Sequence, residues 1–182
     1  MELGARLATV AAKRDVPFVA SYCEYGGVIS HAALTCTVVS GEVARNSAGV
    51  VRISYTLQGN GAAAAVIRDA DRKVIVTLFP DRQLAVRDRT EFGVPHSYSG
   101  LDLIGPSHLK SGIPCKRVQD SVARLRNLDE LWISEELGVV VVDFLATEAG
   151  MRIWHLDSLV EGEPPPELFE IPEGFRVEEA ED

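Results

Sequence analysis

The sequence predicts a mainly β domain: a curved antiparallel sheet of about ten strands, arranged as a half-barrel or a sandwich-like meander, with small helical caps. Three observations support this fold class. Short β-prone segments of about five to eight residues follow one another, separated by turn residues. No stretch has the length and spacing of a long central helix. Strands do not alternate with helices, which disfavours a parallel sheet.

Residues 1–15 are expected to form a short N-terminal helix or arm, because Leu3 and Leu7 recur at near-helical spacing among alanines. The same stretch makes a poor signal peptide. Glu2 precedes any basic residue, and Arg6 interrupts a short apolar run. Two locations therefore remain open: the cytoplasm, or export of a chain whose leader has been removed.

Residues 16–160 are expected to form the antiparallel meander. Its first strands lie in "PFVASYCEY", which ends at Gly26, and in "ALTCTVVSGEVARN", which is interrupted at Gly41. In "VVRISYTLQ", Val51 and Ile53 alternate with polar residues, which is the period of a half-buried antiparallel strand. "AAVIRDADRKVIVTLFPDRQLAVRD" predicts three strands joined at "DADR" and "PDR", because Asp and Pro favour tight turns.

Residues 90–113 are the least regular stretch, rich in Gly, Pro and Ser. We expect a long connection there, with a short strand or a single helical turn. A connection longer than about 12 to 15 residues is often functional. Strands resume after it in "IPCKRVQDSV", "LDELWIS", "LGVVVVDFLAT" and "MRIWHLDSLV".

The chain closes with "EGEPPPELFEIPEGFRV" and a short acidic tail, residues 179–182. The three prolines suit the opening of one helical turn, since their missing N–H groups cost little there. Phe169 and Ile171 follow, and burying each side chain stabilises by about 1.5–3 kcal/mol. Residues 161–178 are therefore expected to act as a clasp on an open end of the sheet, over a core or over a ligand cavity.

The composition excludes several classes of protein. The 182 residues suit one domain, 1–182, and the 46% hydrophobic and 25% charged fractions are those of an ordinary globular protein. The net charge of −9 argues against a non-specific nucleic-acid binder, which needs clustered Lys and Arg. No run approaches the roughly 18 apolar residues of a membrane-spanning helix. We expect no nucleic-acid partner and no membrane-spanning segment.

The three cysteines, Cys23, Cys36 and Cys115, lack the paired spacing of a zinc site. Cys23 and Cys36 flank "YGGVISHAA", so one expectation is a cross-strand disulfide between them, which would stabilise the fold by roughly 3 kcal/mol. The other expectation is three buried thiols that act as small hydrophobic residues.

No catalytic, metal or cofactor motif stands out. The histidines form no H-x-x-H or H-E-x-x-H pattern. His96, His108 and Cys115 lie in or beside the 90–113 connection and would be the elements of a hydrolase there, but no nucleophile elbow accompanies them. Cys115 has the simpler interpretation of a strand cysteine facing the core. The chain is therefore expected to be non-enzymatic, with no metal site and no cofactor.

Four aromatic residues are candidates for a ligand site. An incomplete β-barrel leaves a concave apolar face, and a helix, a loop or a ligand must fill it. Trp132, Phe144 and Trp154 lie on late strands, and Phe169 lies in the clasp. They would either line a ligand cavity or belong to the core.

The stretch "ELWISEELGVVVVDFLATEAGMRIWHLDSLVEGEPPPELFEIPEGFRV" resembles the C-terminal part of a family of uncharacterised exported bacterial proteins that end in "P-x-LFxxPxGF". Earlier, "GEVARNSAGVVR" is similar to a hairpin of that family, although Val50 and Val51 stand where a basic residue is usual. The matching positions near the end of the chain are Trp132, Glu136, Leu137, Val139–Val141, Leu156, Pro164–Pro166, Leu168, Phe169, Pro172, Gly174 and Phe175.

The same ending and meander resemble, at the level of the fold, the periplasmic lipoprotein-carrier-like group, whose curved sheet wraps a helix or holds an acyl chain. The resemblance implies a periplasmic or otherwise exported β-domain that binds a lipid, another apolar molecule or a protein partner in its concave sheet. The alternative is a structural or protein-interaction module whose concave face its own side chains fill. Fold alone does not decide between them.

Overall fold

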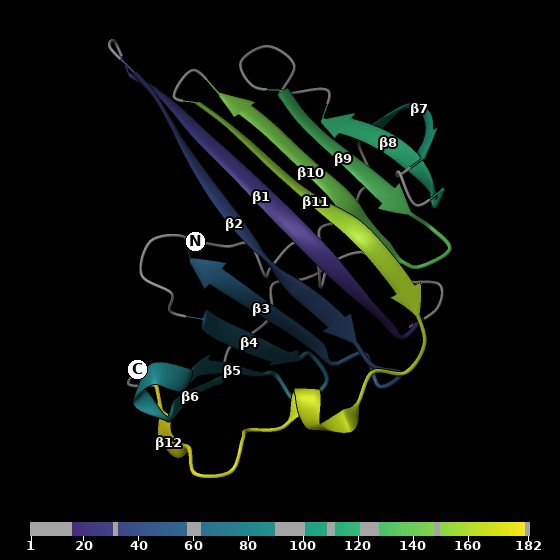
Figure 1. Cartoon of the computed structure of the whole chain (residues 1–182). Coiled ribbons are helices and arrows are strands. Elements are labelled where there is room, and N and C mark those ends of the chain that lie inside the picture. The colour runs from purple at the N-terminus through teal and green to yellow at the C-terminus, as the bar shows by residue number, and fades with distance from the viewer. Residues whose placement is uncertain are drawn as a thin grey trace.

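The computed structural model describes residues 16–30, 33–57, 63–89, 101–108, 112–120, 128–147 and 150–180. Within these ranges the chain forms one twelve-stranded sheet (Figure 1), in the order β12-β6-β5-β4-β3-β2-β1-β11-β10-β9-β8-β7. The predicted fold class is confirmed: the protein is mainly β, and its curved sheet is unclosed. The N-terminal helix expected over 1–15 lies outside the described residues.

The strands run in the order in which the sequence predicts them, with two additions to the ten expected. One is Leu101–His108, within the 90–113 stretch where a long connection with a short strand or a single helical turn was expected, and the other is Arg176–Glu179. No helix in the described ranges is long and apolar enough to cross a membrane. The elements are β1 (Phe18–Ser30), β2 (Ala33–Arg45), β3 (Val51–Leu57), β4 (Ala63–Asp69), β5 (Val74–Phe79), η1 (Pro80–Arg82), β6 (Leu84–Arg89), β7 (Leu101–His108), β8 (Pro114–Asp120), β9 (Leu128–Ser134), β10 (Val139–Thr147), β11 (Gly150–Glu161), η3 (Pro166–Phe169) and β12 (Arg176–Glu179).

Two expected strand breaks are wrong. β1 continues through Gly26 to Ser30, and β2 continues through Gly41 to Arg45. The backbone of both glycines stays in the ladder, because Gly26 pairs with Thr37 and Arg152, and Gly41 pairs with Tyr22 and Tyr55. Pairing on both sides offsets the weak strand preference of glycine. β1 and β2 therefore form a long central hairpin (Figure 1).

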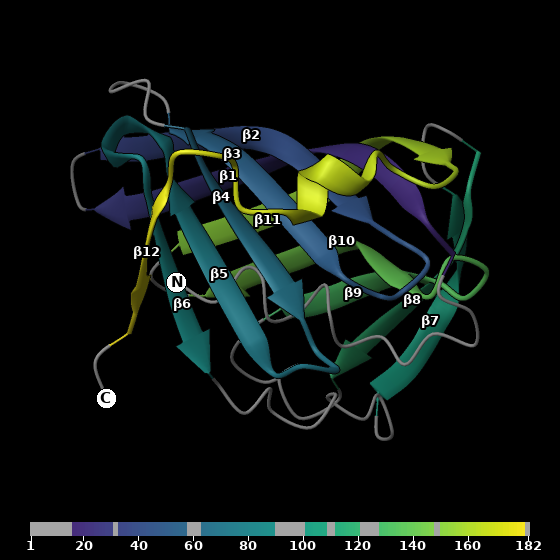
Figure 2. The same cartoon turned by 90° about the horizontal axis from the view of Figure 1, so that it is seen from below.

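The larger apolar cluster lies on one face of the sheet, which we call the inner face. Ala20 lies opposite Val43, and Val43 lies opposite Ile53, so these side chains share that face. Figure 2 shows the sheet curled, with β3 to β6 on the near side and β9 to β11 beyond them. The inner cluster is formed by Phe18, Ala20, Tyr22, Val43, Val51, Ile53, Cys115, Leu137, Val139, Val141, Trp154 and Leu156.

A smaller cluster lies on the opposite, outer face. Arg52 is adjacent to Ile53 in β3 and therefore points to the outer face, and it lies opposite Ile67, which in turn lies opposite Val76. This outer cluster contains Ala65, Ile67, Val76, Leu78 and Ala85, with Val50, Val74, Ile171 and Phe175 packed against it.

The C-terminal segment, residues 162–180, covers this outer cluster. The sequence predicts a clasp over residues 161–178 on an open end of the sheet, over a core or over a ligand cavity; in the structure Ile171 and Phe175 of this segment pack on the outer cluster. The reason is strand β12, which the sequence did not predict. It pairs in parallel with β6, with Arg176 opposite Leu84, while the other strand pairs of the described sheet are antiparallel.

The expected Cys23–Cys36 disulfide is also wrong. In the register of the β1–β2 hairpin, Cys23 lies opposite Ser40, and Cys36 lies opposite Gly27. The two cysteines are thus four positions out of register, about 13 Å along the strands. A disulfide needs Cα atoms within about 7 Å. Cys23 accordingly carries a free thiol.

Candidate functional site

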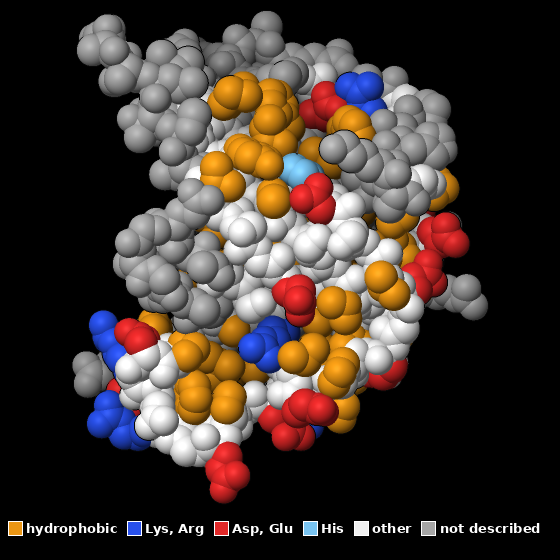
Figure 3. Space-filling model, in the orientation of Figure 1, with side chains coloured by type: hydrophobic (Ala, Val, Ile, Leu, Met, Phe, Trp, Pro, Cys, Tyr) orange, Lys and Arg blue, Asp and Glu red, His pale blue; other side chains and the backbone are white. Residues whose placement is uncertain are grey.

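A hollow of about 670 Å³ lies between the outer face of the sheet and the C-terminal segment. Its floor contains Ile67, Val74 and Val76, and Phe169 and Ile171 contribute the opposite wall. Apolar side chains gather in this region, in the lower part of Figure 3. We call it the outer hollow. Its volume lies within the range of about 300–1,000 Å³ that small-molecule pockets have.

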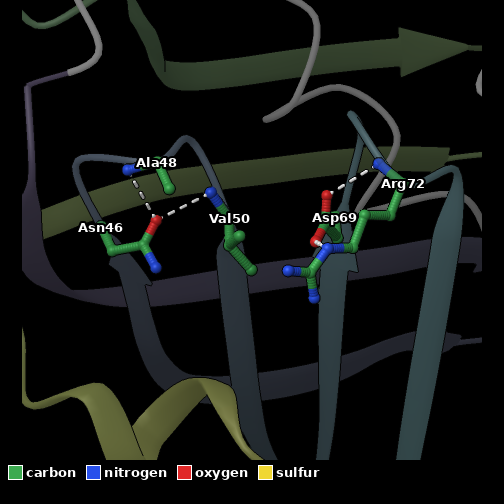
Figure 4. Close-up of polar contacts among 5 residues, drawn as sticks. All are labelled: Asn46, Ala48, Val50, Asp69 and Arg72. Atoms are coloured by element: carbon green, nitrogen blue, oxygen red, sulfur yellow. Dashed lines mark hydrogen bonds and ion pairs between the residues drawn. The ribbon is translucent and has the colours of Figure 1, made fainter.

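The rim of the outer hollow is built by two tight turns (Figure 4). Between β2 and β3, the side-chain oxygen of Asn46 accepts hydrogen bonds from the backbone N–H of Ala48 at 3.1 Å and of Val50 at 2.9 Å. Between β4 and β5, Asp69 accepts from the backbone N–H of Arg72 at 2.9 Å and forms an ion pair with its guanidinium at 3.4 Å. Short polar side chains that bond their own turn hold both loops in one conformation.

The first part of the C-terminal segment is fixed to β3 and to the turn before it. The carboxylate of Glu163 accepts from the backbone N–H of Ser47, at 3.1 and 3.2 Å. The guanidinium of Arg52 donates to the carbonyl of Leu168 at 3.0 Å. Burial lowers the pKa of Arg52. Burying the Arg52 guanidinium costs free energy, and the hydrogen bond to the carbonyl of Leu168 offsets part of this cost. The same hydrogen bond holds η3 against the outer face.

The last part of the segment is fixed to β6. The backbone N–H of Arg176 donates to the carbonyl of Gln83 at 2.8 Å, and that of Ala180 donates to the carbonyl of Arg87 at 2.7 Å. Arg87 also forms an ion pair with Glu179 at 3.1 Å. The segment is thus fixed at both ends, and its middle, residues 169–171, lines the outer hollow.

Charges at the rim of the outer hollow are of both signs. The charged lining residues are Arg72, Arg87, Arg89, Asp69, Asp71 and Glu170. An apolar floor under a mixed polar rim suits an apolar chain with a polar end.

Three charged side chains, those of Glu24, Asp143 and Arg152, lie together on the inner face beside the inner cluster. Glu24 and Asp143 lie on either side of Trp154, in the neighbouring strands β1 and β10. The guanidinium of Arg152 contacts the carboxylate of Asp143 at 3.2 Å. Burial raises the pKa of Glu24; Arg152 works against this shift, and Asp143 adds to it.

Replacing Glu24 with Gln is expected to raise the melting temperature at neutral pH. A carboxyl whose pKa is raised in the fold binds its proton more tightly when native, so ionisation with rising pH costs stability. Gln removes that cost. The gain should disappear below about pH 4, where the carboxyl is protonated in both states. Thermal melts from pH 3 to pH 8 measure it, with Glu42→Gln on the outer face as the control. A gain that persists at pH 3 would contradict the argument.

Four side chains of types that can act as nucleophiles, acids or bases lie on the outer face of β1 and β11. Tyr25 stacks on His155, with ring centroids 5.8 Å apart and planes at 10°. His155 Nδ1 lies 3.3 Å from a carboxylate oxygen of Asp157. Burial, followed by Asp157, raises the pKa of the Cys23 thiol. A reactive cysteine needs the opposite shift. Within the described ranges, no three His, Cys, Asp or Glu residues are arranged to hold a metal ion.

The four predicted ligand residues do not form one site. Trp154 is buried in the inner cluster, 6.0 Å from Tyr22 between ring centroids. Phe144 lies opposite Ile153 and so shares the outer face with Tyr25. Phe169 alone lines the outer hollow.

Trp132 packs at the margin of the inner cluster. Its Nε1 donates to Glu130 at 2.5 Å, and the guanidinium of Arg117 lies 5.4 Å from the centre of its ring. Arg117 also donates to Glu130 at 2.7 Å, which lowers the pKa of that carboxyl. Both the indole N–H and the ring face of Trp132 therefore already have contacts within the protein.

The hydrolase elements are not assembled by the described residues. His96 and the side chain of His108 lie outside the described part of the structure, while the backbone of His108 ends strand β7. Cys115 is buried in β8, and its thiol donates to the carbonyl of Ile113 at 3.2 Å. The expected simpler interpretation of Cys115, a strand cysteine in the core, matches this position.

Apart from Phe169, the residues of the outer hollow were not predicted from the sequence. The signal that was available is the apolar character of both alternating sets in "VIVTLF" of β5, which predicts that both faces are covered. A second apolar partner, the "LFEIP" stretch, is present later in the chain.

No protein-family model matches the chain, and no curated protein is similar to it. Among solved structures, an uncharacterized conserved protein from Thermus thermophilus is similar over 91% of each chain, with 13% identity and a TM-score of 0.62. MucB, in its complex with MucA(peri), is similar over 87% of this chain and 55% of that chain, with 18% identity and a TM-score of 0.51. This chain therefore spans about half the length of that MucB chain.

A LolA superfamily protein from Nitrosomonas europaea is similar over 90% of this chain and 94% of that chain, with 6% identity and a TM-score of 0.48. The first two similarities establish a shared fold, and at these identities they extend no further than the fold.

Proposed function

We propose that this chain is a non-enzymatic binding domain of the bacterial envelope that takes an apolar chain into the outer hollow. The observation that carries the proposal is the hollow itself, about 670 Å³ in volume, with Ile67, Val74 and Val76 on its floor. An apolar chain placed there would gain about 25 cal/mol for each Å² removed from water. Its polar end would lie among the charged side chains of the rim.

The envelope location rests on the C-terminal sequence, which resembles a family of exported proteins. The "PPPELFEIPEGF" pattern of this sequence supplies Phe169 and Ile171 of the hollow. Because the segment that lines the hollow is the segment that carries the resemblance, we assign both to one function.

Filling the hollow tests this function. The probe is dodecyl maltoside below its micelle concentration, with binding followed by native mass spectrometry and calorimetry. Val74→Trp places a large ring over the floor and should weaken binding at least tenfold. The matched control is Val160→Trp, because Val160 is 70% exposed and lies outside the hollow. Equal binding by wild type and Val74→Trp, with both folded by circular dichroism, would remove the hollow as the site.

A second candidate function is recognition of a protein partner on the outer face of β1 and β11. Tyr25 is 45% exposed and Met151 is 43% exposed. Tyr25 lies opposite Ile153, which lies opposite Phe144, so an apolar row crosses three strands. Figure 3 shows apolar side chains gathered in this upper region. Exposed apolar groups of this kind mark interaction surfaces.

The two proposed functions predict that different substitutions abolish the capture of a protein partner. A partner captured from the host by the wild type should be lost with Tyr25→Ser combined with Met151→Ser, and kept with Val74→Trp. Capture that survives the double substitution would exclude this surface.

A further inference from the structure

Strand β12 has one backbone edge that pairs with no described strand. It is the terminal strand of the sheet order, with β6 as its neighbour on one side (Figure 2). The backbone N–H groups of Arg176 and Ala180 donate toward β6, at 2.8 and 2.7 Å. Successive residues of a strand direct their N–H and C=O groups to alternate sides. Val177 and Glu179 therefore direct both groups away from β6.

The two edges of the described sheet differ in how well they suit an added strand. β7, at the other edge, has an irregular register between Leu103 and Gly105 and contains Pro106. Bulges and prolines hinder the pairing of a further strand. β12 has a continuous register against β6, contains no proline, and exposes all four of its residues. The edge of β12 is therefore the better template.

This template is ordered by contacts on the side away from its free edge. Ile171 and Phe175, which precede the strand, pack on the outer cluster. The guanidinium of Arg87 in β6 forms an ion pair with Glu179 at 3.1 Å. Because the strand is already held in an extended conformation, a partner does not lose the entropy of ordering it.

The charges of β12 decide which partner fits. Residues 176–182 contain four carboxylates and one guanidinium. Like charges on neighbouring strands destabilise their pairing, and opposite charges stabilise it. An acidic strand is therefore disfavoured, and so is a second copy of this chain, whose net charge is −9. A basic strand has the complementary charge.

The carboxylates of β12 are accessible to such a partner. The side chains of Glu178 and Glu179 are 48% and 62% exposed and point to opposite faces. Each has an arginine nearby: Arg176 lies 2.9 Å from Glu178, and Arg87 lies 3.1 Å from Glu179. Exposed ion pairs contribute little stability, so both carboxylates remain available to a further cation.

We infer that the free edge of β12 binds an extended basic segment of a partner protein as an added antiparallel strand. Val177 and Glu179 each exchange two backbone hydrogen bonds with this segment, as paired residues of antiparallel strands do. Lysine or arginine side chains of the segment lie beside Glu178 and Glu179. Val177, which is 44% exposed, provides an apolar contact. None of these three residues lines the outer hollow, so this inference does not depend on the proposed function.

Amide hydrogen exchange of the full chain, followed for each residue by NMR, tests the inference. The probe is the peptide acetyl-KVKVKVK-amide, and the controls are acetyl-EVEVEVE-amide and acetyl-KVKPKVK-amide, which lacks the central N–H. At saturation the basic probe should slow exchange at Val177 and Glu179 by about tenfold. The amides of Arg176 and Ala180 already donate toward β6, so they are the internal reference and should change less than about twofold.

Two positions separate backbone pairing from charge. Val177→Pro removes an outward N–H, at the kind of edge position where proline is tolerated, while Val177→Thr keeps the N–H and the branched shape. The proline variant should bind the basic probe at least about fivefold more weakly, and the threonine variant should match the wild type. Glu178→Lys should weaken the basic probe and strengthen the acidic one, each about threefold in about 20 mM salt. Slow exchange at Ala180 shows that β12 is still paired in each variant.

Three results would overturn the inference. The first is unchanged exchange at Val177 and Glu179 with the basic probe up to about 5 mM. The second is equal binding of the proline-containing peptide, which would show that no strand is added. The third is equal binding of the acidic and basic peptides at low salt. If Val74→Trp abolishes binding of the basic peptide and the β12 amides do not respond, the peptide binds in the outer hollow instead.

Discussion

Arg45→Met is expected to destabilise the fold by about 3–5 kcal/mol, because it leaves several carbonyls without their donor and each buried unsatisfied group costs about 1–3 kcal/mol. Arg45 is 5% exposed, at the end of β2. Its Nε and Nη2 donate to the carbonyl of Val16 at 3.0 and 2.7 Å, and its Nη2 also reaches the carbonyl of Leu137 at 2.5 Å. Methionine fills similar space and leaves these buried carbonyls without donors.

The large effect follows from what Arg45 connects. Val16 precedes β1, and Leu137 lies in the turn between β9 and β10, so one guanidinium joins three parts of the chain. The guanidinium also lies 5.1 Å from the centre of the Phe18 ring, in the inner cluster. Lysine retains the charge but lacks the planar fork, so Arg45→Lys should fall between wild type and Arg45→Met.

Urea unfolding followed by tryptophan fluorescence measures this loss. Arg72→Met is the matched control, because the Arg72 side chain is 83% exposed and its ion pair with Asp69 is at the surface. Exposed pairs of this kind contribute about 1 kcal/mol or less. If Arg45→Met loses no more stability than Arg72→Met, the buried network does not hold the three segments together.

Different surroundings on the two faces of the sheet are a consequence of strand geometry. Side chains alternate between the faces, so one strand can serve two environments. In β3, Ile53 belongs to the inner cluster while Arg52 reaches the C-terminal segment on the outer face. In β11, Trp154 points into the inner cluster while His155 lies on the outer face beside Tyr25. A single curved sheet thus separates the outer hollow from the inner cluster.

The sequence predicts the strands well because their signals are local. Alternation in "VVRISYTLQ" and the turn residues of "DADR" and "PDR" act over a few positions, and the structure has β3 to β6 there. Asn46 and Asp69 hold their own turns by bonds within four residues. The structure confirms these elements because they do not depend on distant parts of the chain.

What the sequence could not predict depends on register and on long-range pairing. The Cys23–Cys36 disulfide fails because the register of the β1–β2 pair places Cys23 opposite Ser40. β12 is paired with β6, about 90 residues earlier, and its four exposed residues show no alternation of apolar side chains. The placement of Phe169 on the outer face follows from that pairing.

Gly41→Ala is expected to have the other large effect, a loss of about 3 kcal/mol or more, because the added methyl group has no room. A Cβ atom at Gly41 would lie 1.8 Å from the carbonyl oxygen of Ser54 and 2.8 Å from Cε1 of Tyr22. The Tyr22 ring is a side chain and can turn away at the cost of packing in the inner cluster. The Ser54 oxygen belongs to the backbone of β3, so β2 and β3 must separate to admit the methyl group.

Two further variants test which contact is responsible for the loss of stability expected in Gly41→Ala. Ser40→Ala is the control, since Ser40 is the exposed neighbour in the same strand and its change should be within about 0.5 kcal/mol. Tyr22→Leu combined with Gly41→Ala removes the contact with the ring and leaves the contact with the backbone. If the Ser54 oxygen is the cause, this pair is no more stable than Gly41→Ala alone in urea unfolding. Rescue by Tyr22→Leu would instead assign the loss of stability to the contact between the added methyl group and the tyrosine ring.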